Sequence, residues 1–513
     1  MKSLKFLKFS KFFMAFFLAA ALLFGILPSC GGNMPQTTGT GGGDGPAGAQ
    51  DPGEEQKATE ARLGPELPDG IVFDGYVFTV LAHREDTDDW LAPEPREVMS
   101  EKENGEPIND AIYRRNSVVK EKYHIEFAMV ANANEKTMLQ KSVLAGDDIY
   151  DAVIMLNDNI SAIVPANLLT EVSKLPYIDL GKPWWDEAVT SMSVAGKNYL
   201  LGGDILILDN EATSAILFNK DMMGELGMDL PYGIVKEGKW TFDRLRELMK
   251  GASADLNGDG QMTANEDRWG FVTFNDTLHA LLVGGGGTLA QKDNSDIPYM
   301  TLADAKNAAI SDKAMDIMYN KADVVNIQTA LKDFGPNWIY GYEAYHGAFE
   351  QDRALFIWVR MRVVEKFRGM ESNFGILPMP KYDDSQKQYH SAVNPWSGVL
   401  LGVPKGAGDL SRTGIILEAL AAESRYTVQP AYYEIVLQRK FARDEESGEI
   451  LDIIFNSRVY DIGAIYSFGN VFLDYIGLCY KSDTNLASYY EKRSPAMEKD
   501  IAKLVDMIKT MED

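Results

Sequence analysis

A β-strand is predicted by Tyr76-Val77-Phe78-Thr79-Val80-Leu81, because β-branched and aromatic residues recur there in alternation. Working outward, we expect a helix over residues 109–122, a second strand over 125–130, a helix over 135–145 and a buried strand over 151–155. Strands that alternate with helices form βαβ units around a largely parallel sheet. The sequence therefore predicts an α/β fold.

The same alternation resumes further along the chain. A strand is expected over 214–218, a helix over 221–226, and another helix that begins at Thr241 as N-cap and runs to about residue 252. The chain has 513 residues and a 45% hydrophobic content, so we expect two domains of ordinary size.

Several segments resemble, in the same order, those of the extracellular solute-binding proteins of sugar-type ABC importers. The segments that carry this resemblance are Tyr150-Asp151-Ala152-Val153, Asn167-Leu168-Leu169-Thr170-Glu171-Val172, Ala195-Gly196-Lys197-Asn198-Tyr199-Leu200, Leu217-Phe218-Asn219-Lys220-Asp221, Lys239-Trp240-Thr241-Phe242-Asp243, Arg353-Ala354-Leu355-Phe356 and Phe374-Gly375-Ile376-Leu377-Pro378-Met379-Pro380. Each motif is weak alone, but their order covers nearly all of residues 71–425.

The resemblance implies a two-lobed, periplasmic-binding-protein-like (type II) fold with a hinge and an interlobe cleft. Lobe one would contain residues 70–208 and 400–455, and lobe two would contain 209–399 and 456–513. The implied function is the capture of a carbohydrate, preferably an oligosaccharide, for an ABC permease in the membrane, by a monomer that is not an enzyme. A surface glycan-adhesion lipoprotein without a transporter is the alternative.

The N-terminus predicts export. Four lysines among the first eleven residues precede an apolar run from Phe12 to Leu27, which is typical of a signal peptide. Leu27-Pro28-Ser29-Cys30 resembles the lipobox of bacterial lipoproteins. We therefore expect a signal peptide over 1–29, a lipid on Cys30, a flexible linker over 30–69, and an extracytoplasmic protein anchored to the bacterial cell membrane. A cleaved signal with an incidental cysteine is the other interpretation.

The charge of the chain argues against nucleic acid as a partner. The formal net charge is −25, and removal of 1–29 deletes four lysines and no acids, which gives −25 − 4 = −29. Such an acidic chain repels phosphate backbones and anionic lipid, so membrane contact is expected through the anchor alone. Cys479 is the only other cysteine, and with Cys30 lipidated no disulfide can form.

The segment from Asp255 to Glu266 fits the calcium-loop pattern D-x-[DN]-x-[DN]-G-x5-E at every position. Its side-chain and carbonyl oxygens recur at the spacing that wraps one cation, and Gly260 permits the sharp turn. The expected ligands are Asp255, Asn257, Asp259, Gln261 and Glu266. Because no second loop is visible and a strand follows, we expect structural rather than regulatory calcium. An Asn- and Gly-rich surface turn is the alternative.

A sugar site needs aromatic platforms together with carboxylate, amide or guanidinium groups. The candidate ligand-binding residues are Trp184, Trp185, Asp204, Trp338, Tyr340, Trp358, Arg360 and Trp396. Because the family's contacts come from loops that face the hinge, Asp204, Arg360 and Trp396 are the first choices. Core packing is the alternative for any single Trp, and a structural ion pair is the alternative for Arg360.

Catalytic motifs are not evident. The five histidines are scattered without metal-ligand spacing, and Gly284-Gly285-Gly286-Gly287 lacks the Lys-Ser/Thr of a phosphate loop. No G-x-S-x-G elbow occurs. The 75 acidic residues leave a paired-carboxylate glycosidase open, although nothing in the sequence marks two of them as facing.

Overall fold

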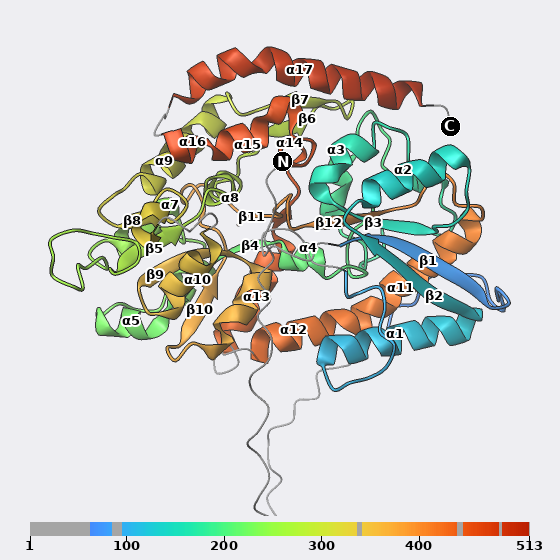
Figure 1. Cartoon of the computed structure of the whole chain (residues 1–513), viewed down its shortest axis with the longest axis horizontal. Coiled ribbons are helices and arrows are strands. Elements are labelled where there is room, and N and C mark those ends of the chain that lie inside the picture. The colour runs from blue at the N-terminus through green and yellow to red at the C-terminus, as the bar shows by residue number, and fades with distance from the viewer. Residues whose placement is uncertain (1–61, 85–94, 336–340, 439–444, 482–484, 512–513) are drawn as a thin grey trace, which may run out of the picture. The chain divides into compact units, whose positions relative to one another are not determined.

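The computed structural model describes residues 62–84, 95–335, 341–438, 445–481 and 485–511. The predicted signal peptide and the lipidation site Cys30 lie outside these residues, as does most of the linker. Within them, no helix is both long enough and apolar enough to cross a membrane. The stretch Leu63–Asp513 forms one compact unit that contains two main sheets (Figure 1).

The first sheet belongs to lobe one and has the strand order β12-β3-β1-β2. Its strands are β1 (Tyr76–His83), β2 (Ile125–Asn132), β3 (Ala152–Leu156) and β12 (Val399–Gly402). The first three run parallel, with Tyr76 opposite Ile125 and His83 opposite Asn132, whereas β12 pairs antiparallel with β3. The carboxyl ends of β1, β2 and β3 therefore meet at one edge.

The second sheet belongs to lobe two and has the order β10-β4-β9-β5-β8. Its strands are β4 (Ser214–Asn219), β5 (Trp269–Thr273), β8 (Val324–Asn326), β9 (Ala354–Arg360) and β10 (Phe374–Leu377). Strand β5 is parallel to β8 and β9, and β4 is antiparallel to its neighbours. Every residue of these five strands is buried, as expected for a sheet covered on both faces.

Helices cover both sheets. In and beside lobe one these are α1 (Pro107–Tyr123), α2 (Glu135–Ala145), α3 (Ile160–Ile163), α11 (Leu410–Tyr426) and α12 (Val428–Gln438). In lobe two these are α5 (Lys220–Glu225), α6 (Tyr232–Lys236), α7 (Phe242–Met249), α8 (Thr277–Gly284), α9 (Ala305–Met318), α10 (Tyr342–Glu350) and α13 (Glu445–Asn456). The C-terminal segment adds α14 (Ile462–Tyr466), α15 (Val471–Ile476), α16 (Leu478–Lys481) and α17 (Leu486–Thr510).

Helix α13 packs with lobe two, whereas the sequence placed 400–455 in lobe one. The Tyr232 hydroxyl of α6 lies 3.3 Å from the Ser447 hydroxyl of α13, and Lys236 pairs with Glu449 at 2.8 Å. Helix α12, in contrast, packs against α1. The chain therefore changes lobe between α12 and α13.

Two of the segments that cross between the lobes run beside each other. The first contains α4 (Leu208–Glu211), and the second follows β11 (Ser391–Ala392), which pairs with β13 (Arg458–Val459). Thr213 and Val393 form a β-bridge between the two crossovers, and the Asn394 amide donates to the Ala212 carbonyl at 3.0 Å. This pairing fixes how the crossovers meet at the hinge.

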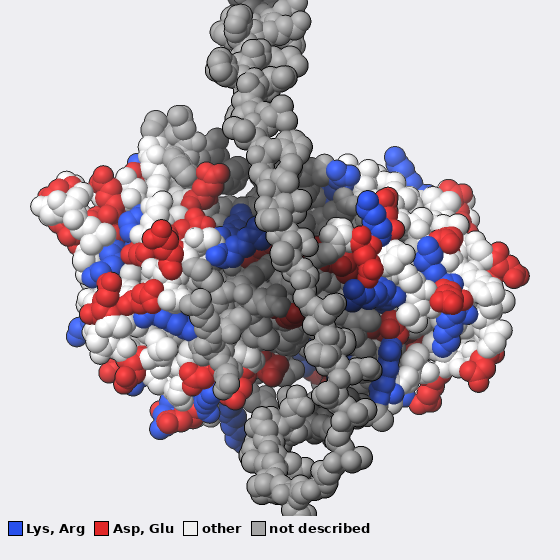
Figure 2. Space-filling model, turned by 90° about the horizontal axis from the view of Figure 1, so that it is seen from below, with Lys and Arg blue, Asp and Glu red and all other residues white. Residues whose placement is uncertain are grey.

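Local sequence signals explain several element boundaries. Thr241 caps α7 as predicted, because its hydroxyl accepts a hydrogen bond from the Arg244 amide. Glu106 caps α1 in the same way, with Pro107 at the first helical position, where its missing N–H costs nothing. On the face shown in Figure 2, acidic and basic side chains are interspersed over the described surface.

Candidate functional site

Polar side chains lie at the carboxyl ends of strands in both lobes. In lobe one His83 ends β1 and Asn157 follows β3, and in lobe two Asp276 lies just after β5 while Arg360 ends β9. Ligands of open α/β sheets bind at this end of the strands. We call Asn157, Asp276, Arg360, Asn394 and Trp396 the strand-end site.

Asp276 is buried, and only one of its two carboxylate oxygens has a hydrogen-bond partner among the described residues. Its Oδ2 accepts a hydrogen bond from the Asn394 side-chain amide at 2.8 Å, whereas its Oδ1 has no hydrogen-bond partner among the described residues. Burial raises the pKa of Asp276, and the charge of Arg360 together with the Asn394 hydrogen bond opposes that rise. This oxygen is itself buried, so a ligand hydroxyl group reaches it only when the residues around it move apart.

Asn157 presents an unsatisfied amide from the other lobe. Its side chain is fully buried, and within the described structure neither its oxygen nor its nitrogen has a hydrogen-bond partner. Its backbone amide donates to the Gly398 carbonyl at 3.0 Å. A Cβ on Gly398 would lie 2.6 Å from the Asn157 nitrogen, so this close approach requires glycine.

The second crossover brings the two lobes' polar groups together. Asn394 contacts Asp276, and four residues later Gly398 contacts Asn157. The Asn394 side chain also accepts a hydrogen bond from the Trp396 amide at 3.0 Å, which holds the turn. The half-buried Trp396 ring meets Phe472 edge to face, with centroids 5.1 Å apart.

Aromatic rings support Arg360. Its guanidinium lies over the Tyr342 ring, 5.9 Å from the centroid, and Tyr342 stacks on Phe274 at 4.7 Å. Such cation–π stacking fixes the orientation of a guanidinium group. Carboxylate, amide, guanidinium and aromatic groups therefore gather at this edge of the second sheet.

A second polar group occupies the same edge of lobe one. The His83 Nδ1 lies 3.3 Å from the Glu135 carboxylate, which also accepts a hydrogen bond from the Asn159 side chain at 2.6 Å. His83 is 3% exposed, and its Nε2 lacks a hydrogen-bond partner in the described part of the chain. The His83 Nε2 atom is therefore a further candidate contact for a polar ligand.

Three of the predicted ligand-binding residues lie at or beside this site. Arg360 and Trp396 belong to it, and Trp358 lies two residues before Arg360 on β9. The Trp358 indole is 3% exposed, and its N–H has no partner among the residues that the structure describes. Trp338 and Tyr340 lie outside the described residues.

Trp184, Trp185 and Asp204 lie elsewhere. Both indole N–H groups donate to the Glu418 carboxylate of α11, at 3.1 and 2.8 Å, and both rings are buried in lobe one. Asp204 pairs with Arg425 at 3.1 Å, and burial raises its pKa to about 6. These contacts give the three residues packing partners in and beside lobe one, so we leave them out of the strand-end site.

Asn157, Asp276 and Asn394 were not among the residues chosen from the sequence. A signal for the first two exists, because each follows a continuous buried strand, where a polar residue marks the strand's carboxyl end. Only the folded chain shows that Asn394 contacts Asp276.

A buried ionic cluster lies beside the first crossover. The Arg458 guanidinium pairs with Asp186 of lobe one at 2.9 Å and lies 3.9 Å from Asp209 of α4. Burial raises the pKa of Asp209 to about 7, against the attraction of Arg458. Arg458 therefore links a lobe-one loop, the first crossover and the segment that follows α13.

The predicted calcium loop is an exposed, tightly turned segment before β5. The Asp255 carboxylate accepts hydrogen bonds from the Gly258 and Gly260 amides at 2.7 and 2.8 Å, and the Asn257 amide donates to Glu266 at 3.2 Å. Within the described residues no three His, Cys, Asp or Glu side chains are gathered closely enough to hold a metal. The oxygen donors of the loop fit calcium by type and by spacing along the chain. The calcium site therefore stays a prediction, and it requires these oxygens to come together around the bound ion.

Comparisons with known proteins concern the fold. The sequence matches no protein-family model, and no curated protein matches it. Among solved structures, UspC from M. tuberculosis is similar over 83% of this chain and 100% of its own, with 13% identity and a TM-score of 0.53. A cyclo/maltodextrin-binding protein complexed with maltotetraose is similar over 85% and 98% respectively, with 14% identity and a TM-score of 0.50. The chain therefore has a mixed α/β, two-lobed, periplasmic-binding-protein-like fold.

Proposed function

We propose that the chain is an extracytoplasmic solute-binding lipoprotein that captures an oligosaccharide between its lobes and delivers it to an ABC permease. The strand-end site would hold the sugar, and the lipid on Cys30 would keep the protein at the membrane. The proposal is for binding without catalysis.

The observation that carries this proposal is the set of unsatisfied polar atoms just after a strand in each lobe. Asn157 in lobe one and Asp276 in lobe two each bury polar atoms without a described partner. A buried polar group without a partner costs about 1–3 kcal/mol, so it persists where another molecule completes its hydrogen bonds.

The chemistry of these groups suits a carbohydrate. An amide offers donors and an acceptor, a carboxylate accepts, and a guanidinium donates, which together match the paired donor and acceptor roles of sugar hydroxyls. The half-buried Trp396 adds aromatic surface for the C–H face of a sugar ring. A protein of the same fold binds maltotetraose, which supports an oligosaccharide as the ligand class.

The test is a thermal-shift screen of the purified full chain against neutral mono- and oligosaccharides, followed by calorimetry on each hit. Asp276→Asn should weaken the binding of a hit about tenfold or more, because it removes a charged acceptor from a buried site. Asp204→Asn should leave affinity unchanged, because Asp204 pairs with Arg425 away from this site. Equal affinity in Asp276→Asn and the wild type would refute this location for the ligand.

A further inference from the structure

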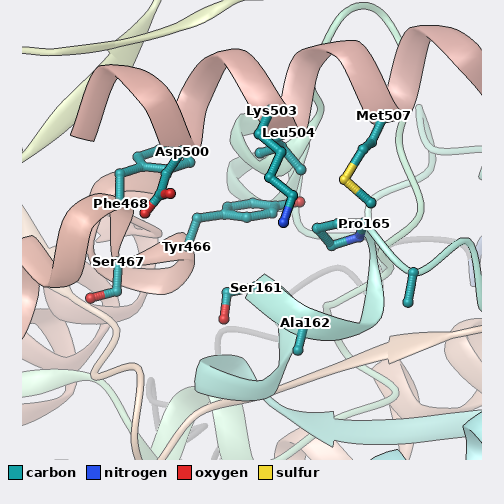
Figure 3. Close-up of a pocket in the computed structure, with 11 residues that line it drawn as sticks. Ser161, Ala162, Pro165, Tyr466, Ser467, Phe468, Asp500, Lys503, Leu504 and Met507 are labelled. Atoms are coloured by element: carbon teal, nitrogen blue, oxygen red, sulfur yellow. The ribbon is translucent and has the colours of Figure 1, made fainter. Parts of the chain in front are cut away.

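A cavity of about 470 Å³ lies between α3 of lobe one and the C-terminal helix α17 (Figure 3). One wall is formed by Ser161 and its neighbours on and just after α3, and the other includes Tyr466, Lys503 and Met507. Its volume falls in the range of small-molecule sites, about 300–1,000 Å³. None of its lining residues belongs to the strand-end site.

Both walls of the cavity continue the elements that carry the strand-end site. Helix α3 begins three residues after Asn157, so Ser161 lies about one helical turn beyond that amide. On the other wall, Tyr466 ends α14, whose N-cap Asp461 contacts the His279 ring at 3.1 Å. His279 belongs to α8, which begins directly after Asp276. The cavity is therefore linked to the strand-end site through α3 on one wall and through α14 and α8 on the other.

The side chains around the cavity suit an uncharged, hydroxyl-rich ligand. Tyr466 stacks on Phe468 with centroids 5.7 Å apart and rings inclined by 7°, which fixes its position. Helix α17 contributes the ammonium group of Lys503 and the carboxylate of Asp500, one charge of each sign (Figure 3). Ser161 adds a hydroxyl group. A phosphorylated or otherwise strongly charged ligand would meet no net complementary charge here.

We propose that this cavity is an accessory subsite for further sugar units of an oligosaccharide whose first units occupy the strand-end site. Tyr466 would pack against a ring, while Lys503 and Asp500 would bind its hydroxyl groups from α17. The proposal rests on the proposed function, because it assigns the cavity to the same ligand. It predicts that affinity increases with chain length beyond the units held at the strand ends.

The experiment measures binding of the full chain to an array of neutral glycans from disaccharides to octasaccharides, with calorimetry on the shortest and longest binders of one series. Lys503→Ala should weaken binding of the long glycan about threefold to tenfold, the effect of losing one ordinary hydrogen bond at an exposed side chain, and leave the short one unchanged. Lys499→Ala is the control, because Lys499 is exposed on the same helix and does not line the cavity.

A second variant is included because the result for one exposed side chain can be misleading by itself. Tyr466→Ala should reduce the ratio of long-glycan to short-glycan affinity, and this ratio is independent of any uniform loss from partial unfolding. If both variants keep the wild-type ratio, or if affinity does not rise with length, the subsite is refuted while the strand-end site stands. If no glycan of the array binds the wild type, the proposed function itself fails.

Discussion

Substitution of Asn157 by alanine should separate a ligand-binding role from a structural one. The Asn157 amide is fully buried and has no described hydrogen-bond partner, so it destabilises the ligand-free protein. Its removal should therefore raise the stability of the ligand-free chain while weakening ligand binding. A residue that serves the fold would show the opposite effect on stability.

The magnitude follows from two opposing effects. Removing an unsatisfied buried amide recovers about 1–3 kcal/mol. The void left by the missing group costs on the order of 1 kcal/mol. The free energy of unfolding should therefore rise by about 1 kcal/mol, measured by urea denaturation without ligand. Ligand affinity, measured by calorimetry, should fall by about tenfold, the loss of one to two hydrogen bonds in a desolvated site.

Asn219 provides a matched control, because it is equally buried but satisfied. Its side chain donates to Asp352 at 2.6 Å and accepts from the Met222 amide at 2.8 Å as the N-cap of α5. Asn219→Ala should lose about 1–3 kcal/mol of stability. If Asn157→Ala loses as much, its amide is satisfied within the folded protein, and the argument for Asn157 as a ligand contact is refuted.

Three further predictions concern stability. Chelation of calcium, or Glu266→Gln, should lower the melting temperature, since an ion at a hundredfold excess over its Kd stabilises by about 2.7 kcal/mol, and no shift would contradict the calcium site. Glu418→Ala should lose about 2–5 kcal/mol in urea denaturation, because it leaves two buried indole N–H groups without an acceptor. The pKa of Asp209 is raised from 3.8 to about 7, so the folded state binds the extra proton, and the contribution of Asp209 to stability should fall as pH rises through that window. In Asp209→Asn this group does not titrate, so the urea midpoint of the variant relative to that of the wild type should rise between about pH 4 and pH 7, and a constant difference would contradict the assignment.

Local patterns in the sequence predicted most elements of the first half of the fold. The expected strand at 76–81 is β1, the helix at 135–145 is α2, and Thr241 caps α7. These features depend on periodicity and capping within a few residues. Which lobe α13 packs against depends instead on distant contacts such as the one between Tyr232 and Ser447, which are 215 residues apart. No local sequence pattern encodes such a contact.

Only part of the candidate site could be predicted from the sequence, because contacts between distant residues decide the rest. Arg360 and Trp396 were chosen because the family's contacts come from loops that face the hinge, and the structure places Arg360 at the end of β9 and Trp396 beside Asn394. Trp184 and Trp185 have an equally suggestive local sequence, yet their indoles bind a carboxylate more than 230 residues away. A tryptophan's role is decided by such distant partners, which a single sequence does not reveal.

Contacts between the lobes differ from region to region in whether the protein itself supplies both hydrogen-bond partners. Beside the hairpin β6 (Ala290–Lys292) and β7 (Pro298–Met300), the Lys292 ammonium donates to the Ser193 hydroxyl at 2.6 Å, and the Asp296 carboxylate accepts from the Gly196 amide at 2.9 Å. There the protein supplies both partners, so this contact needs no ligand. At Asn157 and Asp276 the two lobes instead present groups that the described protein leaves unsatisfied. Under our proposal a bound sugar makes the missing hydrogen bonds to both lobes at once, and its binding energy therefore favours the arrangement in which they face each other.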